Sequence, residues 1–395
     1  MEKGILQGLR VLDLTRVLAG PYATRILADF GAEVIKVQSK KTATGAESNT
    51  TPYFGAWNRN KKSIALDLSH PEARELFLDL VKLCDVVMEN FSPRVMPNWG
   101  LEYDRLKAVN PRLVMLSMSG MGQTGPWKDF VAFGPTLQSL GGLTYLTSYG
   151  RDEPVGLGYA YADLVSGLFG VIAVLAALDF RDRTGQGQYI DLSEYEAVCA
   201  TIGPALMERF LLHKEIPPRG SQRESLQASP YGCYRCSGED RWCVIAVFTE
   251  DEWQALCRVL GNPAWAKETR FSSLFMRKKH KEELDGYLEA WTVRQSAESL
   301  VQRLQWAGVS AGVVQNAEDL AGDPQLLARH FFVSMNHPTL GESKTDTSPI
   351  RFLDSARGPF KAAPLLGEDN QYVYRELLGL SEEMILSYIE RGIIA

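Results

Sequence analysis

Asp163 is the acid whose surroundings most favour chemistry. It is the only charged residue in the stretch Gly156–Gly170, which otherwise holds Gly, Ala, Tyr, Ser and apolar side chains. The apolar run Leu164–Leu178 predicts a buried helix that begins next to this acid. A helix N-terminus keeps a carboxylate ionised, and an ionised carboxylate in a dry niche can attack an activated carbonyl to form an acyl-enzyme. Asp is also a common N-cap residue, so both roles stay open at this point.

Two short basic runs supply local positive charge in a chain whose net charge is −6. Lys40 and Lys41 follow one predicted strand, and Arg59–Lys62 precedes another. Cations at the edge of a parallel sheet can bind phosphates, although a solvated surface explains the same charges. The negative net charge disfavours nucleic acid as a partner.

The cysteines and histidines do not predict a metal centre. Cys233 and Cys236 form a Cys-x-x-Cys pair, and Cys243 is a third thiol at a loose spacing. A structural zinc site needs four ligands, and no nearby histidine supplies the fourth. We therefore expect reduced thiols that pack in strands, and no metal.

The elements that must position these groups form an α/β pattern in the first half of the chain. Helices are expected over Pro21–Phe30 and over 69–83, where Ser69–Glu72 matches a capping box. No Gly-x-Gly-x-x-Gly follows the first predicted strand, which disfavours a dinucleotide dehydrogenase. Strands that alternate with helices imply a parallel sheet covered on both faces. The expected strands are Arg10–Leu14, Glu33–Val37, Ser63–Leu68, Asp85–Met88, Leu113–Ser117 and Tyr189–Leu192.

A polar, proline-bearing stretch around 215–230 marks a linker, after which the pattern changes. The following residues predict a smaller α+β domain, and two amphipathic helices are expected at 372–379 and 381–391. The elements of the smaller domain are expected at Tyr231–Cys236, Trp242–Phe248, Glu250–Leu260, Lys279–Trp291, Ala297–Ala307 and Ala311–Gln315.

Length and composition indicate a globular protein. With 395 residues and 45% hydrophobic content, the chain can form two or three domains. The first residues, Met1–Gln7, lack the apolar core of a signal peptide, and we expect no apolar run to reach the roughly 20 residues that a bilayer needs. A cytoplasmic protein without a membrane partner is expected.

Several sequence blocks occur in an order that resembles the class III CoA-transferases. This group includes the formyl-CoA, carnitine-CoA and benzylsuccinate-CoA transferases and also alpha-methylacyl-CoA racemase. The resemblance extends over essentially the whole chain. The blocks are Gly8–Thr15, Ala19–Pro21, Leu27–Val37, Asn58–Leu68, Glu89–Phe91, Asn110–Arg112, Gly120–Pro126, Tyr161–Asp163, Gly185–Gly187 and Pro364–Glu368.

The resemblance implies a Rossmann-like α/β CoA-binding domain built from both chain ends, with a smaller central α+β domain. Residues 1–215 would form the first part of the large domain, 225–325 the small domain, and 330–395 the return to the large one. The resemblance also implies a dimer whose chains interlock like links. Its partner would be a second copy, giving a homodimer, or a paralogous subunit, giving a heterodimer.

The resemblance places the family's catalytic aspartate at Asp163. It implies aspartyl-acyl anhydride and aspartyl-CoA thioester intermediates, with a coenzyme A thioester as co-substrate and no covalently bound cofactor. A glycine-containing loop covers the site in the family, and Ser229–Gly232 lies near that place without a poly-Gly run. The residues expected to bind CoA, from the resemblance and the basic runs together, are Arg16, Leu18, Ala19, Ser39, Lys40, Lys41, Lys61, Lys62, Leu66, Asn90 and Phe91.

Departures from the family pattern bear on the substrate. Val131 and Phe133 occupy places where formyl-CoA transferases have Lys and Tyr, which disfavours a formyl or oxalyl substrate. Aromatic residues around the site favour a hydrophobic or aryl-bearing acid as acceptor, with succinyl-CoA as donor. The residues expected to bind substrate are Phe133, Tyr159, Tyr231 and Gly232.

Two alternative functions follow from the same resemblance. A racemase needs a second acid/base, a histidine about 30 residues before the aspartate, but no histidine lies between His70 and His213. A CoA-binding, non-catalytic subunit of a heteromeric transferase is the other alternative. The presence of Asp163 argues that this chain would be the catalytic one in such a pair.

Overall fold

The computed structural model describes residues 4–150, 152–213, 216–218, 220, 227–355 and 360–394. The chain divides into two compact units. One contains Met1–Tyr145, Gly156–Ile216 and Leu327–Ala395, and the other contains Leu146–Val155 and Pro217–Leu326. The second unit thus includes a short segment, Leu146–Val155, that the sequence did not separate from the large domain. Much of the expected linker lies outside the described residues.

A six-stranded parallel sheet forms the centre of the first unit, in the order β3-β2-β1-β4-β5-β6. This confirms the predicted α/β fold class, and each expected strand is present with small shifts at its ends. The β-branched and aliphatic residues of these runs favour buried parallel strands. The strands are β1 (Arg10–Asp13), β2 (Glu33–Gln38), β3 (Lys62–Ala65), β4 (Val86–Glu89), β5 (Val114–Ser119) and β6 (Gln188–Ser193).

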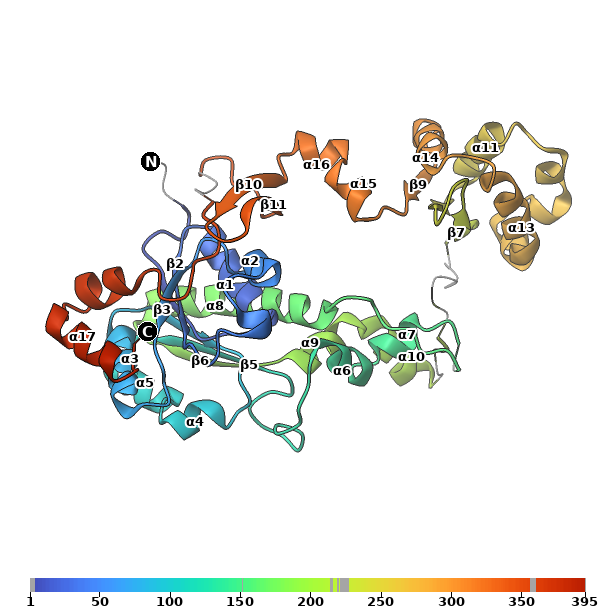
Figure 1. Cartoon of the computed structure of the whole chain (residues 1–395). Helices are drawn as coiled ribbons and strands as arrows, with labels where there is room; N and C mark the ends of the chain where they lie inside the picture. Colours follow the sequence, from blue (N-terminus) through green and yellow to red (C-terminus); the bar gives the residue numbers. More distant parts are fainter. Residues whose placement is uncertain are drawn as a thin grey trace. The chain divides into compact units, whose positions relative to one another are not determined.

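Helices cover both faces of this sheet (Figure 1). Successive strand residues point to opposite faces, so Val11 and Val34 belong to one apolar core while Leu12 and Ile35 belong to the other. The first core is closed by α1 (Ala19–Asp29) and α8 (Tyr161–Thr184). The second is closed by α3 (Pro71–Lys82), α5 (Tyr103–Val109), the π-helical segment η5 (Gln371–Leu377) and α17 (Glu382–Glu390).

Helix α8 corrects the expectation that no apolar run is long enough to span a bilayer. By length and composition it could cross a membrane, and it is the one helix in the described residues that meets this criterion. A Cβ added at Gly167 would lie 2.8 Å from the carbonyl oxygen of Ala19, and one at Gly170 would lie 3.1 Å from Leu116. These close approaches show that one face of α8 packs against α1 and β5, as in the core helix of a globular domain.

The remaining elements of the chain include several that the sequence did not predict. A polar hairpin, β10 (Phe332–His337) and β11 (Gly341–Asp346), is the most prominent. Helix α3 has His70 as N-cap, without a side-chain bond, so the capping box expected from Ser69 is wrong. The other elements are η1 (Gly45–Glu47), α2 (Pro52–Asn58), α4 (Val95–Trp99), α6 (Gly134–Leu140), α7 (Leu143–Thr147), α9 (Glu194–Thr201), α10 (Gly203–Leu212), α15 (Ala317–Ala321) and α16 (Pro324–Ala328).

The second unit contains a three-stranded antiparallel sheet in the order β7-β8-β9, with helices packed on it. Its core includes Trp253, Leu256, Leu284 and Leu300. A capping box between Thr249 and Glu252 starts its first helix. The elements are β7 (Tyr231–Arg235), β8 (Trp242–Ala246), α11 (Glu250–Val259), η3 (Ala264–Lys267), η4 (Thr269–Phe271), α12 (Leu274–Lys279), α13 (Lys281–Thr292), α14 (Ala297–Trp306) and β9 (Ser310–Val313).

The cysteines are all free thiols. Cys236 and Cys243 are buried in the core of the second unit, whereas Cys233 is exposed. Throughout the described part of the chain, no group of three or more His, Cys, Asp or Glu side chains is placed to hold a metal ion.

Candidate active site

Asp163 lies in the first turn of α8 but does not cap it. The N-cap position is Ala160, and Asp163 is the third residue of the helix. The buried Gln138 of α6 performs the capping, because its Oε1 accepts hydrogen bonds from the backbone N–H groups of Tyr161 (2.8 Å) and Ala162 (3.4 Å). The N-cap role that the sequence left open for Asp163 is therefore wrong.

Small residues surround the Asp163 carboxylate. A Cβ added at Gly134 would lie 2.3 Å from Asp163 Oδ2, and Ala160 lies on the same side. Oδ2 is buried and has no hydrogen-bond partner among the described residues. Burial raises the pKa of Asp163, and its own backbone N–H partly opposes this shift. A carboxylate with so little solvation is a better nucleophile than one exposed to water.

Two further titratable groups lie close enough to Asp163 to sense its charge, and the sequence pointed to neither. Burial, followed by the charge of Asp163, raises the pKa of Glu194 to about 8. Burial, followed by the charges of Asp163 and Glu47, raises the pKa of Tyr53 on α2. Both residues are distant from Asp163 in the sequence, so only the folded chain shows that they are its neighbours.

The turn after β1 is tied to the turn after β4. Asn90 Oδ1 accepts a hydrogen bond from the backbone N–H of Arg16 (2.7 Å), and Asn90 Nδ2 donates to the carbonyl oxygen of Arg16 (2.9 Å). The Arg16 guanidinium also lies 5.1 Å from the centre of the Phe91 ring. The structure therefore brings together three residues expected to contact CoA, at the carboxyl ends of neighbouring strands, where α/β proteins bind ligands.

Backbone strain and a buried acid shape the same turn. Val17 has a φ of 65°, a left-handed conformation that a β-branched residue rarely adopts. Its backbone N–H donates to Oε1 of the buried Glu47 (2.7 Å), which compensates part of that strain. Leu18 and Ala19, next along the chain, are buried where α1 begins.

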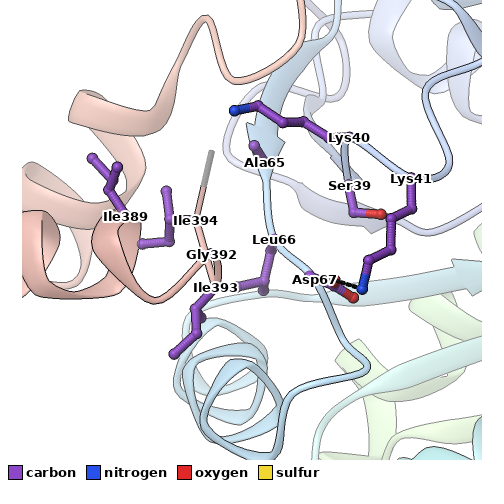
Figure 2. Close-up of a pocket in the computed structure, with 10 residues that line it drawn as sticks. All are labelled: Ser39, Lys40, Lys41, Ala65, Leu66, Asp67, Ile389, Gly392, Ile393 and Ile394. Atoms are coloured by element: carbon purple, nitrogen blue, oxygen red, sulfur yellow. Dashed lines mark ion pairs between the residues drawn. The ribbon is translucent and has the colours of Figure 1, made fainter.

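A pocket of about 220 Å³ lies beyond the ends of β2 and β3. Of the residues expected to bind CoA it contains Ser39, Lys40, Lys41 and Leu66. Figure 2 shows the lysines on one side of the pocket and residues near the chain's C-terminus on the other. The sequence did not predict this second wall, which consists of Ile389, Gly392, Ile393 and Ile394. Lys41 forms an ion pair with Asp67 (2.8 Å) and is largely exposed.

Burial corrects the expectation that Lys61 contacts a phosphate. Its side chain is fully buried, and its three donors bind Asp13 Oδ2 (2.9 Å), the Pro21 carbonyl (3.1 Å) and Asn58 Oδ1 (2.8 Å). An ammonium group has three donors, so none is left for a ligand. Lys62 lies outside the residues that line the pocket, and its amine is 4.2 Å from the Tyr372 ring centre.

The expected substrate residues fall in both units. Phe133 is the N-cap of α6 and Tyr159 directly precedes Ala160, so both flank the small residues around the Asp163 carboxylate. Their side chains are 63% and 57% exposed, which leaves them accessible to a ligand. Tyr231 and Gly232 are in the second unit, on β7.

Comparisons with known proteins agree with one another. The model of CoA-transferase family III matches residues 6–370. The chain is 34% identical to succinyl-CoA–D-citramalate CoA-transferase from Chloroflexus aurantiacus, covering 96% of this chain and 95% of that protein. It is 31% identical to the beta subunit of succinyl-CoA–L-malate CoA-transferase from the same organism, covering 96% of each. A crystal structure of a CAIB/BAIF family protein from Brucella suis has a TM-score of 0.86 and 32% identity, covering 95% of this chain and all of that one.

Proposed function

This chain belongs to CoA-transferase family III, and on that premise we propose that it moves coenzyme A from succinyl-CoA to the carboxylate of a second organic acid, with Asp163 as the nucleophile. One observation carries the residue assignment. Asp163 has a buried, unpaired carboxylate oxygen against Gly134, in a chain that is a class III CoA-transferase.

The first half of the proposed reaction releases the donor acid. The Asp163 carboxylate attacks the thioester carbonyl of succinyl-CoA, which gives a mixed anhydride and the CoA thiolate. The thiolate then attacks the aspartyl carbonyl of this anhydride, which gives an aspartyl-CoA thioester and free succinate. The thioester bond energy stays on the protein, so the transfer needs no ATP.

The second half charges the acceptor by the same two steps in reverse order. The acceptor carboxylate attacks the aspartyl-CoA thioester, forming a second anhydride and the thiolate. The thiolate attacks the acceptor's carbonyl, which yields the new acyl-CoA and regenerates Asp163. Each step forms an oxyanion, and we expect backbone N–H groups of the first turn of α6, which begins at Gly134, to stabilise it.

CoA would lie along the carboxyl ends of the strands. The turn at Arg16, which Asn90 holds through two hydrogen bonds, would contact the pantetheine arm. The pocket with Lys40 and Lys41 would bind the phosphates and the adenosine.

Two acceptor classes are supported by different observations. The exposed rings of Phe133 and Tyr159 favour an aryl-bearing acid. The names of the two relatives favour a short hydroxy dicarboxylic acid such as citramalate or malate. The malate enzyme's beta subunit also leaves open that this chain pairs with a paralogous subunit.

An acceptor panel tests the proposed function. The purified chain is incubated with succinyl-CoA and, separately, with citramalate, malate, glutarate, benzylsuccinate and phenylacetate, and new acyl-CoA products are measured by mass spectrometry. A product with at least one acid is expected. The panel is repeated with acetyl-CoA as the donor. If products form from acetyl-CoA but not from succinyl-CoA, succinyl-CoA is the wrong donor. If neither donor supports transfer, this chain alone does not carry the activity.

A further inference from the structure

Glu194 is a buried acid that the reaction above does not use. It is the first residue of α9, directly after β6. The backbone N–H of the next residue, Tyr195, donates to the Gly120 carbonyl at the end of β5 (2.9 Å), which fixes this helix start at the carboxyl edge of the sheet. Glu194 is 7% exposed.

Packing brings Glu194 and Asp163 to the same place. Helices α6, α8 and α9 share a small apolar cluster that includes Leu137, Ala162 and Val198, one residue from each helix. Asp163 follows Ala162 directly, and Glu194 precedes Val198 by one helical turn. Both carboxyls therefore lie at the first turns of neighbouring helices, beside this apolar cluster.

In the part of the chain that the structure describes, no cation contributes to the pKa shift of either acid. Helix α6 carries no titratable side chain, α9 adds only Tyr195, Glu196 and Cys199, and strand β6, which leads into α9, carries Tyr189 and Asp191. From α1, Arg25 forms an ion pair with Asp346. Tyr53 on α2 also senses the charge of Asp163, but its pKa is raised from an already high value, so it stays neutral.

Two carboxyl groups in such a setting do not both ionise near neutral pH. Like charges in a dry site disfavour each other, and the more buried group keeps its proton. Burial and the charge of Asp163 raise the pKa of Glu194 to about 8.

We propose that Glu194 is a positioning residue for Asp163: as a neutral acid it leaves Asp163 the single anion of the site, and its ionisation turns the transfer off. The reason is charge repulsion. A second negative charge beside Asp163 repels the acceptor carboxylate, which must approach the aspartyl thioester, and the CoA thiolate, which must leave and return. This inference rests on the proposed function and adds a residue that sets the working pH range.

The pH dependence of transfer tests the inference. In the wild-type enzyme, kcat/KM for the acceptor falls roughly tenfold per pH unit above about pH 8. Glu194→Gln mimics the neutral acid, so it keeps most of the activity at pH 7 and loses this alkaline decline. If the buried amide of Glu194→Gln prevents folding, the neutral and apolar Glu194→Met variant is measured in its place. It is also expected to lose the alkaline decline. Glu196→Gln changes an exposed acid on the same helix and keeps the decline.

Two results would overturn the inference: an alkaline decline that persists in the neutral variants, or a folded Glu194→Gln protein that is inactive at pH 7.

A second readout needs no substrate. The infrared difference spectrum between the wild type and Glu194→Gln at pH 7 is expected to contain the carbonyl band of one protonated carboxyl, which is lost as pH rises through about 8; the subtraction removes the band of the buried Glu89, whose pKa is raised to about 7. If the band behaves this way in a chain that transfers no CoA, the proposed function fails while the protonated Glu194 stands; if transfer occurs without the band, the inference on Glu194 fails alone.

Discussion

Around Asp163 the side chains are small because the carboxylate itself fills the available space. Gly134 and Ala160 leave room for Oδ2 and offer it no hydrogen bond, so the anion is desolvated without being neutralised. Gln138 satisfies the start of α8 in place of the acid. The capping function and the proposed nucleophile are thereby separated onto two residues, which makes each testable alone.

Asp163→Asn is expected to abolish transfer without unfolding the protein. The amide keeps the size of the side chain but lacks the nucleophilic anion, so the rate falls by several orders of magnitude. Wild-type protein incubated with succinyl-CoA and quenched should carry a CoA adduct, or a hydroxylamine-sensitive acyl group, on the peptide that contains Asp163. Asp179→Asn, an exposed acid on the same helix, is the control and keeps full activity. Near wild-type transfer by Asp163→Asn would disprove the mechanism.

Gly134→Ala tests the fit around the carboxylate. The new methyl group would lie 2.3 Å from Asp163 Oδ2, so the carboxylate must turn away from its present position. We expect a loss of transfer of at least tenfold, because misplacing a reacting group by about 1 Å can cost about a hundredfold in rate. Gly203→Ala introduces the same group where nothing lies within 4 Å, and steady-state kinetics of the two variants should differ. Equal rates would mean that the carboxylate position is not critical.

At the scale of elements, a buried charge network holds the turn after β1. Asp13 ends this strand and accepts hydrogen bonds from the backbone N–H (2.9 Å) and the hydroxyl (2.5 Å) of Thr15 and from Lys61 Nζ (2.9 Å). Lys36 donates to the Thr15 carbonyl (2.7 Å). The turn that carries Arg16 is thus held by the fully buried side chains of Asp13, Lys36 and Lys61.

Asp13→Asn should destabilise the fold strongly. Removing one partner of a buried ion pair costs about 3–5 kcal/mol, because the other charge remains unpaired. Burial tends to raise the pKa of Asp13, but the charges of Lys36 and Lys61 outweigh it and lower the pKa to about 2. This depressed pKa contributes stability above about pH 4 that is lost as pH falls toward 2.

Urea unfolding between pH 7 and pH 2 measures this effect. The free energy of unfolding of the wild type should decrease as pH falls from 7 to 2. Asp13→Asn should have a lower free energy of unfolding at pH 7 and a smaller decrease toward pH 2. Asp79→Asn, which breaks the exposed Lys82 pair (2.7 Å), should cost less than about 1 kcal/mol. Similar costs for the two variants would show that the buried network does not stabilise the turn.

Lys40 and Lys41 are expected to contribute to CoA binding. Changing both to Gln should weaken CoA affinity by roughly tenfold at low salt, since exposed charge pairs are each worth up to about 1 kcal/mol. The difference should shrink as ionic strength rises. Isothermal titration calorimetry with CoA measures the affinity of each protein. The control is a Lys82→Gln, Lys107→Gln double variant, which has the same change of net charge away from the pocket. Unchanged affinity would move the phosphate site elsewhere.

The strands were predictable because runs of aliphatic residues report burial on both faces of a sheet. The hairpin β10–β11 was missed because β11, Gly-Glu-Ser-Lys-Thr-Asp, has no apolar alternation to reveal a strand. Lys61 looked like a surface cation because its partners Asp13 and Pro21 are 48 and 40 residues away along the chain. Glu194 was missed for the same physical reason: nothing local distinguishes an acid that becomes buried only when α8 and α9 pack.

At the scale of the whole molecule, two helices of the described chain expose large apolar side chains. Helix α10 exposes Met207, Phe210, Leu211 and Leu212, and α8 exposes Leu168, Phe169 and Ile172 on the side away from its packed face. Contiguous apolar surface of this kind indicates contact with another protein or a membrane. We propose that a second chain covers it, in keeping with the expected interlocked dimer.

Sedimentation at micromolar concentration should give twice the chain mass of 44.0 kDa, or the mass of a heterodimer if a paralogous subunit is co-expressed. Phe210→Glu places a charge in the exposed apolar surface of α10 and should shift the protein toward monomer. Lys107→Gln, at an exposed position of α5, changes the net charge by the same amount and is the control. A wild-type protein that sediments at 44.0 kDa would contradict the dimer, and one that partitions into vesicles would favour a membrane contact through α8.

The glycine beside Asp163 also has an evolutionary consequence. Any side chain at position 134 displaces the carboxylate, so selection for activity leaves this position almost no alternatives. Phe133, one residue earlier, points into open space and can be exchanged at little cost to folding. New acceptor specificities in this lineage are therefore expected to arise by drift at such exposed neighbours, while the immediate walls of the nucleophile stay fixed.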